Sequence, residues 1–440
     1  MRSTEHAYRA ELESHLAEVF GGFRHLKQRQ WGSRYVRGLM MEGARKSAGA
    51  MALYVPEGDE QALQQFVSDS PWDYLDVRRR LVEQALAVFP EDRYLIFDET
   101  GFPKQGQQSV GVARQYCGTL GKIGNCQVAV SLHLATQQAA VPLDWDLYLP
   151  ETWSADPERL RKAQVPEGTQ FRTKGEIALD ELNRVRSWGI GAYTVLADAG
   201  YGNSTEFRAG LIALGHCYVV GVQGSTGVWP AEVPGAPKAR RSRMGRPPVC
   251  WDYGDARPTS VEALARSVPA EAWQTVSWDY GAGKKTSRFY RQRIHPAPRD
   301  YFHGKWPEPE EWLLIEWPED QPEPSHYWLS TLPADIAIQA LVRTAKLRWR
   351  IELDYRQLKD ELGLDHFEGR RWPGWQRHVT LVSVAYHFLV RQQLQGKKAA
   401  DPPSCPSGHA THPSPLDRDL SRLRAPHSAS HRAFWRTLTE

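Results

Sequence analysis

The feature that most constrains this chain is a pair of short apolar stretches, each ending in an aspartate followed by a glycine-containing turn. The first stretch runs from Tyr94 to Asp98, and the second runs from Thr194 to Asp198. A short β-prone run bounded by turn residues is typical of a buried central strand, which carries its last side chain to the edge of a sheet. The two stretches therefore predict two carboxylates at a sheet edge.

A third carboxylate lies on a predicted helix that runs from Asp335 to about Glu361. The apolar residues of this helix recur at helical spacing and form one stripe, which consists of Ile338, Leu341, Val342, Ala345 and Trp349. Continued, the stripe reaches Glu352, with Arg348 one turn before it and Lys359 two turns after it. A glutamate on the core-facing side of a helix is costly unless it is paired or bound to metal. The helix and the two strands together predict a divalent metal site.

The predicted ligands are Asp98, Asp198 and Glu352, which would also be the catalytic residues. Carboxylate oxygens suit Mg²⁺, with Mn²⁺ as a substitute. Two such ions about 4 Å apart would clamp the attacking and leaving oxygens of a phosphodiester. Arg348 and Lys359 would then neutralise phosphate oxygens beside the metal. Purely structural roles for these residues stay open. An aspartate after a strand often caps a turn or helix, and Glu352 could pair with Arg348.

The composition is ordinary for a soluble globular protein, with 41% hydrophobic and 24% charged residues. The five cysteines are scattered and show no CxxC spacing, which argues against a disulfide framework or a zinc site and indicates a reducing compartment. No apolar run approaches the roughly 20 residues that span a bilayer, and the N-terminus lacks the apolar core of a signal peptide. We therefore expect a cytoplasmic protein without a membrane partner.

The net charge of +3 does not by itself indicate nucleic acid, but basic residues cluster locally. Residues 24–46 hold seven basic residues, Arg34 and Arg37 among them, and one acid. Residues 238–246 hold five basic residues and no acid. The arginines of this second cluster are Arg240, Arg241, Arg243 and Arg246. Such patches bind phosphate backbones or are merely solvated faces, and both interpretations stay open.

Gly245-Arg246-Pro247 in the second cluster resembles the core of a minor-groove hook. In such a hook an extended arginine enters the narrow minor groove of A·T-rich DNA.

The pattern along the chain predicts an α/β protein in five segments. Residues 1–90 are expected to form a helical domain, either a DNA-binding head or a docking bundle. Residues 91–222 alternate strands and helices in an order that suits the mixed sheet of a ribonuclease-H-like core. Residues 223–332 contain short aromatic strands and predict a β-rich insertion, after which residues 333–396 return to the core with the glutamate helix. Residues 397–440 are expected to be a disordered tail.

The segment around Glu352 resembles the signature helix of DDE transposases of the insertion-sequence 4 group. That signature reads Tyr, two residues, Arg, three residues, Glu, six residues, Lys. Arg348, Glu352 and Lys359 match it, whereas Ala345 stands at the tyrosine position. Further stretches are more similar to the related insertion-sequence 701 family, namely residues 70–73, 98–102, 109–116, 197–202 and 363–369. The resemblance covers about residues 20–395 and does not extend to the tail.

This resemblance implies a ribonuclease-H-like catalytic core, interrupted by a β insertion, that cuts and rejoins DNA with Mg²⁺ in a cut-and-paste type of transposition. It implies double-stranded DNA, as transposon ends and as target, and a homodimer in the synaptic complex in the bacterial cytosol or nucleoid. The long interval between Asp198 and Glu352 leaves room for the insertion. Two other classes stay open: an unrelated metal-dependent phosphohydrolase, and a transposase-derived regulator that binds DNA without cutting it.

Overall fold

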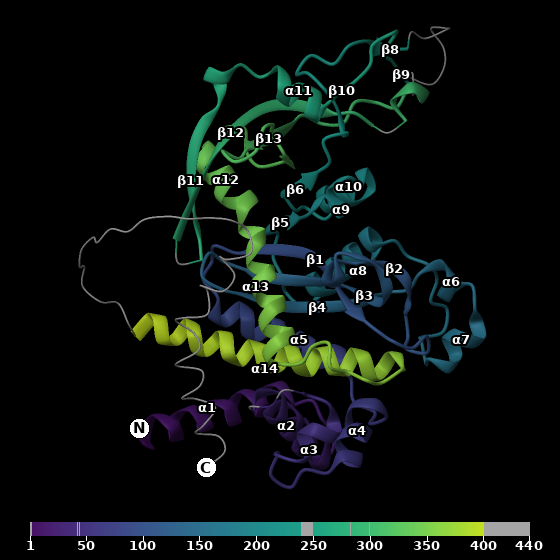
Figure 1. The fold of residues 1–440 in the computed structure, drawn as a ribbon, viewed down its shortest axis with the longest axis vertical. Helices are drawn as coiled ribbons and strands as arrows, with labels where there is room; N and C mark the ends of the chain where they lie inside the picture. The colour runs from purple at the N-terminus through teal and green to yellow at the C-terminus, as the bar shows by residue number, and fades with distance from the viewer. Residues whose placement is uncertain are drawn as a thin grey trace.

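The computed structural model describes residues 2–41, 43, 45–238, 250–281, 283–298 and 300–399. The predicted basic loop with Arg240, Arg241, Arg243 and Arg246 lies outside this part of the chain, as does nearly all of the predicted tail. The N-terminal helices lie at one end of the long axis, the strands of residues 227–330 at the other, and the remaining strands between them (Figure 1). Within the described residues, no helix is both long and apolar enough to cross a membrane.

A mixed sheet of twelve strands forms the centre of the protein. Its strands are β1 (Tyr94–Pro103), β2 (Ala113–Cys117), β3 (Lys122–Ala135), β4 (Ala140–Tyr148), β5 (Thr194–Ala197), β6 (Tyr218–Val222), β7 (Gly227–Trp229), β10 (Thr259–Ser260), β11 (Gln274–Tyr280), β12 (Gly283–Pro296), β13 (Glu311–Trp317) and β14 (His326–Ser330). They follow the order β10-β7-β12-β13-β14-β6-β5-β1-β3-β2, with β11 beside β12 and β4 beside β3. Strand β5 is parallel to β1 and to β6, whereas the other pairs are antiparallel.

The strands predicted as an insertion continue the central sheet. Strand β14 pairs with β6 from Tyr327 opposite Val222 to Ser330 opposite Val219. Both faces of β13 are buried, because Leu313 and Ile315 belong to one apolar cluster and Leu314 belongs to another. A separate short pair, β8 (Ala236–Pro237) with β9 (Trp251–Asp252), lies at the far end of the molecule (Figure 1).

The helices cover the sheet and extend it at the N-terminal end. They are α1 (Arg2–Val19), α2 (Leu26–Met40), α3 (Ala48–Ala52), α4 (Glu60–Ser68), α5 (Tyr74–Val88), α6 (Glu151–Ser154), α7 (Pro157–Lys162), α8 (Lys174–Ser187), α9 (Ala199–Gly202), α10 (Thr205–Ala213), α11 (Val261–Ser267), α12 (Ile338–Lys346), α13 (Arg350–Arg356) and α14 (Trp372–Ala399). Thr173 and Glu176 form a capping box at the start of α8, and Ser204 caps α10 through the Phe207 backbone NH. These caps fix the residues at which the two helices begin.

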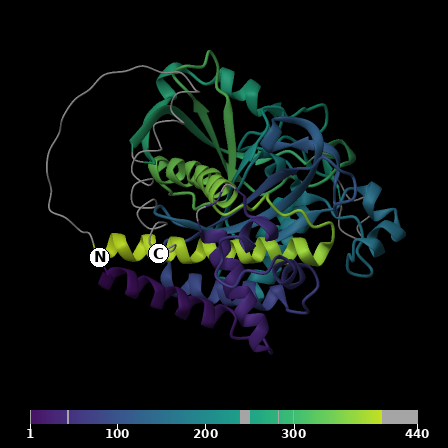
Figure 2. The ribbon, with the colours of Figure 1, turned by 60° about the horizontal axis from the view of Figure 1, so that its bottom comes forward.

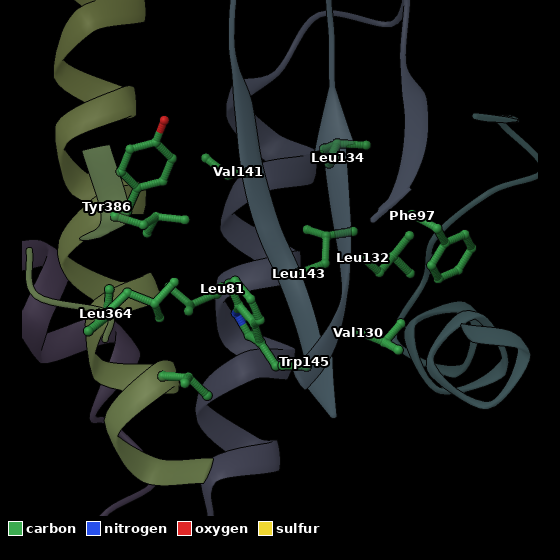
Figure 3. Close-up of a cluster of buried hydrophobic side chains, with 14 of the residues drawn as sticks. Leu81, Phe97, Val130, Leu132, Leu134, Val141, Leu143, Trp145, Leu364 and Tyr386 are labelled. Carbon is green, nitrogen blue, oxygen red and sulfur yellow. The ribbon is translucent and has the colours of Figure 1, made fainter. Parts of the chain in front are cut away.

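Helix α14 lies between helices α1 to α4 and the sheet, α1 runs alongside it, and α5 packs beside it on β4 (Figures 1 and 2). Figure 3 shows Leu81 of α5, Trp145 of β4 and Tyr386 of α14 among the buried apolar side chains that join these layers. The N-terminal helices therefore share one hydrophobic core with the sheet.

Buried charges reinforce this junction. The Arg78 side chain is 1% exposed, and its Nη1 lies 2.8 Å from Asp144 Oδ1. Arg78 also donates hydrogen bonds to Thr380 Oγ1 and to Gln376 Oε1 on α14. Arg184 of α8 lies 2.9 Å from the other oxygen of Asp144. One arginine thus ties α5, β4 and α14 together.

The helix predicted over residues 335–361 consists of four segments. Helix α12 is followed by a 3₁₀ turn (Leu347–Trp349), by α13 and then by a π-helical turn (Gln357–Glu361). A 3₁₀ turn rotates each residue by about 120° instead of about 100°, so the apolar face shifts around the axis. The buried residues of the later segments are accordingly Ile351, Asp354 and Leu358. The prediction that Glu352 lies on the core-facing side is therefore wrong, since its side chain is 59% exposed.

Candidate active site

Asp98 lies in the middle of β1, directly opposite Ser131 of β3. Its side chain is 12% exposed, and its Oδ1 accepts a hydrogen bond from the Glu99 backbone NH at 2.8 Å. Burial raises the pKa of Asp98 to about 7; the Arg348 guanidinium acts in the opposite direction, and the negative charge of Asp198 adds to the rise. The site therefore contains a desolvated carboxylate whose ionised form needs a nearby cation.

Asp198 follows the last residue of β5, and the register brings it level with Asp98. Ile96 of β1 is aligned with Leu196 of β5, and each aspartate lies two residues further along its strand. Asp198 Oδ1 accepts from the Gly200 backbone NH at 2.8 Å, so the capping role that the sequence left open is present. The short α9 packs tightly on β6, because a Cβ at Gly202 would overlap the backbone carbonyl of that strand.

Arg348 connects two of the three predicted carboxylates. It lies in the 3₁₀ turn, where its Nη1 is 3.0 Å from Asp98 Oδ2 and its Nη2 is 3.6 Å from Glu352 Oε1. Burial lowers the pKa of Arg348, but Asp98, Asp198 and Glu352 together raise it above its ordinary value. All three acids thus act on one guanidinium, which also fulfils the pairing of Glu352 with Arg348 that the sequence left open.

The donor chemistry at this site fits a hard cation, because the converging groups are carboxylate oxygens and the pKa of Asp98 is raised. The positions of these carboxylates do not form a complete set of metal ligands. Within the described residues, no three Asp, Glu, His or Cys side chains lie close enough together to hold a metal ion. The Arg348 guanidinium instead lies between Asp98 and Glu352.

Lys359 belongs to the π-helical turn after α13. Its Nζ donates to the Gly101 carbonyl at 3.0 Å and to Thr119 Oγ1 at 2.8 Å. Burial lowers the pKa of this amine, against the raising influence of Asp365 and other acidic groups. Because an ammonium group has three donors, these contacts leave one proton for another acceptor. Lys359 thus links the helix to β1 and to the β2–β3 turn.

Two residues that the sequence analysis did not single out hold α13 against the sheet. The Tyr355 hydroxyl lies 2.6 Å from Ser131 Oγ, and Asp354 Oδ2 lies 3.1 Å from His133 Nδ1. Tyr386 of α14 donates to the other oxygen of Asp354 at 2.9 Å. The signal in the sequence was an aspartate at helical spacing between two buried apolar residues of α13 and the following turn.

Two other predicted phosphate-binding residues that the structure describes, Arg34 and Arg37, lie on α2 in the N-terminal part of the chain. Arg34 pairs with Glu57 and lies over the Trp31 ring, with its guanidinium carbon 4.6 Å from the ring centroid. Arg37 pairs with Glu13 of α1. Both charges are therefore partly neutralised within the protein.

Comparison with known proteins gives two matches. The model of the DDE superfamily endonuclease family matches residues 18–285, which is more than half of the chain and includes both aspartates. The chain is also 28% identical over 339 residues to the probable transposase for insertion sequence element IS701 from Microchaete diplosiphon. That alignment covers 76% of each of the two chains.

Proposed function

The chain belongs to the DDE superfamily of endonucleases and is a DDE-type DNA transposase, and we propose that Asp98, Asp198 and Glu352 are its catalytic carboxylates. The observation that carries this proposal is that Arg348 pairs with both Asp98 and Glu352, while the strand register sets Asp198 beside Asp98. Two of these residues are aligned across β1 and β5, and the third begins the helix that faces them. The reaction would be cleavage and transfer of DNA strands at the ends of an insertion sequence related to IS701.

Asp98, Asp198 and Glu352 would hold Mg²⁺ as two ions, with Mn²⁺ able to replace it. When bound, the ions would supply Lewis-acid stabilisation of the attacking and leaving oxygens of the phosphodiester. The raised pKa of Asp98 supports this assignment, because the Arg348 guanidinium only partly offsets the burial of that carboxylate and a metal ion would favour its ionised form further.

Arg348 would act as the phosphate-binding cation of the site. Its guanidinium presents several NH donors in one plane, which suits the two oxygens of a phosphate. Arg348 contacts Asp98 and Glu352, and beside these carboxylates it would stabilise the negative charge that grows on the phosphate in the transition state. The remaining proton of Lys359 would bind a second phosphate oxygen.

Other parts of the chain would bind the DNA duplex outside the cut. We assign this role to Arg34 and Arg37 in a helical N-terminal domain and to the arginines of the basic loop at residues 238–246. In this proposal DNA binding and catalysis belong to different domains of the chain. The domains are those predicted from the sequence: residues 1–90, 91–222, 223–332, 333–396 and 397–440. Two protomers would join two transposon ends as a homodimer in the cytosol.

The test is metal-dependent nicking of a labelled transposon end by single variants. Asp98→Ala, Asp198→Ala and Glu352→Ala are each expected to abolish cleavage in Mg²⁺ and to leave DNA binding intact, because removing like charges relieves repulsion. Glu361→Ala serves as the matched control, since it removes a carboxylate nine residues further along the same region. Full cleavage by any one of the three variants contradicts the assignment. A wild-type chain that binds ends but never cuts them would be a regulator.

A further inference from the structure

A groove of about 640 Å³ lies beside β2, the last strand in the order of the sheet. It is bounded by β2, β3 and the short helices α6 and α7, which Figure 1 shows side by side. Arg114, Arg159 and Lys174 line it, together with the amide side chains of Gln115 and Asn125. Within the described part of the chain, no aspartate or glutamate is among the lining residues. Asn125 and Gln115 donate to backbone carbonyls of the protein, so the arginine and lysine side chains supply the positive charge of the groove. A groove lined by cations without acids suits a negatively charged ligand.

The positive charge of the groove is only partly compensated. Within the described residues, no hydrogen bond or ion pair involves the exposed side chain of Arg114. The same holds for three exposed basic residues on two elements that also line the groove: Lys122 of β3, and Arg161 and Lys162 of α7. Lys174 is paired with Glu99, and the nearby acid Asp156 caps α7 through the Arg159 backbone NH.

Arg159 is held in place by the fold. Its guanidinium carbon lies 3.7 Å from the centroid of the buried Trp153 ring. Its Nη2 donates to the Gln107 carbonyl at 3.1 Å, and the Trp153 indole NH donates to the Val112 carbonyl at 2.8 Å. The groove wall is therefore preorganised, which lowers the ordering cost of binding.

We propose that this groove binds the phosphate backbone of duplex DNA at a distance from the scissile phosphate. The motif at residues 109–116, to which the active site assigns no role, supplies Arg114, Gln115 and one wall of the groove. Such contacts position a duplex without reading its sequence. The inference rests on the DNA substrate of the family and not on the metal ligands proposed above.

The placement relative to Asp98 decides which part of the DNA can reach the groove. Lys174 pairs with Glu99, the residue after Asp98 on β1. Successive side chains of a strand point to opposite faces, so the carboxylate and the groove lie on opposite sides of the same strand. A duplex engaged at the active site must pass the sheet edge to enter the groove. The groove therefore binds DNA beyond the cut and not the reacting phosphate.

The experiment compares Arg114→Glu with Arg186→Glu, which reverses an exposed arginine at the end of α8, outside the groove. Affinity is measured for nested duplexes that extend stepwise from the cleavage point, one series into the transposon end and one into the flanking DNA. A third series lengthens an unrelated target duplex in the same steps. Arg114→Glu is expected to lower the ratio of long-duplex to short-duplex affinity at least tenfold at moderate salt, and the control is expected to leave it unchanged.

The series that loses its length advantage identifies whether the groove holds the transposon end, its flank or the target. In the salt titration, the double variant Arg114→Gln/Arg159→Gln is expected to reduce the slope by about two, as for two lost phosphate contacts. An unchanged ratio in all three substrates overturns the proposal, even if the carboxylate variants abolish cleavage as expected. The proposal is also overturned if Arg114→Glu changes the oligomeric state of the protein in the absence of DNA. That result would make the groove a contact between two copies of the chain.

Discussion

Arg348 Nη1 lies 3.0 Å from Asp98 Oδ2 and joins the turn between α12 and α13 to the middle strand of the site. The same guanidinium reaches Glu352, so one positive charge stabilises two acids that would otherwise repel each other across the site. A metal ion entering between the carboxylates would compete with this guanidinium for the same oxygens. Released from Asp98, Arg348 would be free to bind a phosphate, which links metal binding to substrate binding.

The raised pKa of Asp98 predicts a pH-dependent stability. The folded-state pKa of about 7 lies above the value of about 3.9 for an unfolded aspartate, so the native state holds a proton that the unfolded chain has lost. This carboxyl therefore destabilises the fold as pH rises from about 4 to about 7, with no further change above that range. Melting temperatures of wild type and Asp98→Asn, measured without metal, are expected to diverge across this window, with the variant the more stable.

The comparison with Asp98→Asn isolates this group, because Glu311 is also buried and has its pKa raised to about 7. Added Mg²⁺ is expected to raise the melting temperature of the wild type more at pH 8 than at pH 5, since only the ionised carboxylate is a ligand. The variant is expected to lose most of that gain. Parallel melting curves for the two proteins at all pH values would contradict the raised pKa.

Lys359 is expected to have two separable roles. Lys359→Ala removes hydrogen bonds to the Gly101 carbonyl and to Thr119 Oγ1, so the melting temperature is expected to fall by a few degrees. It also removes one phosphate contact, so the salt-dependence slope for cleaved ends is expected to decrease by about one. Thr119→Val is the control, because it removes a partner of the ammonium group and keeps the charge. A lower melting temperature with an unchanged slope would leave Lys359 a purely structural role.

The sequence predicted the central strands and most helices because their signals are local. Asp98 and Asp198 end or interrupt short apolar runs, which is a pattern visible in the sequence. Thr173 and Ser204 cap helices through neighbouring residues, so these helix starts do not depend on the tertiary fold. The pairing of β14 with β6 was not predictable in this way. This pairing joins residues about a hundred positions apart in the sequence. No residue in either strand indicates which strand it pairs with.

The orientation of Glu352 could not be predicted, because the prediction assumed that one α-helical period runs from residue 335 to residue 361. The helix instead changes from α to 3₁₀ and back before it reaches Glu352. The predicted stripe, which passes through Ala345 and Trp349, reaches Glu352 only if every turn has 3.6 residues. The 3₁₀ turn over Leu347–Trp349 breaks that rule and turns Asp354 toward the core instead. Its partners, His133 and Tyr386, come from β3 and α14, and only the folded chain brings them together.

Arg78 is expected to be essential for stability. Arg78→Met keeps much of the buried volume but leaves Asp144, which is fully buried, without the guanidinium on its Oδ1. Removing one partner of a buried ion pair costs about 3–5 kcal/mol, because a desolvated charge remains. Urea unfolding measures this loss, and Arg79→Met is the control, because Arg79 is 37% exposed and pairs on the surface of the same helix. Equal midpoints for the two variants would show that the network adds no net stability.

Tyr355 is expected to position Glu352 without touching the DNA. Its hydroxyl bonds to Ser131, which is aligned with Asp98 in the sheet, so this contact fixes the helix of one carboxylate relative to the strand of another. Tyr355→Phe keeps the ring against His133 and Trp145 and removes only the hydroxyl. A misplacement of a carboxylate by a fraction of an ångström is expected to lower the cleavage rate about tenfold and leave the KM for the DNA end nearly unchanged.

Ser131→Ala removes the other half of the same hydrogen bond and is expected to produce the same loss. If the contact acts as one unit, the double variant Ser131→Ala/Tyr355→Phe is expected to be no slower than either single variant. Single-turnover cleavage at saturating DNA measures the rate, and thermal unfolding shows whether the fold is weakened. Losses that multiply in the double variant, or a rate loss that follows the melting temperature, would assign Ser131 and Tyr355 to stability instead of to the positioning of Glu352.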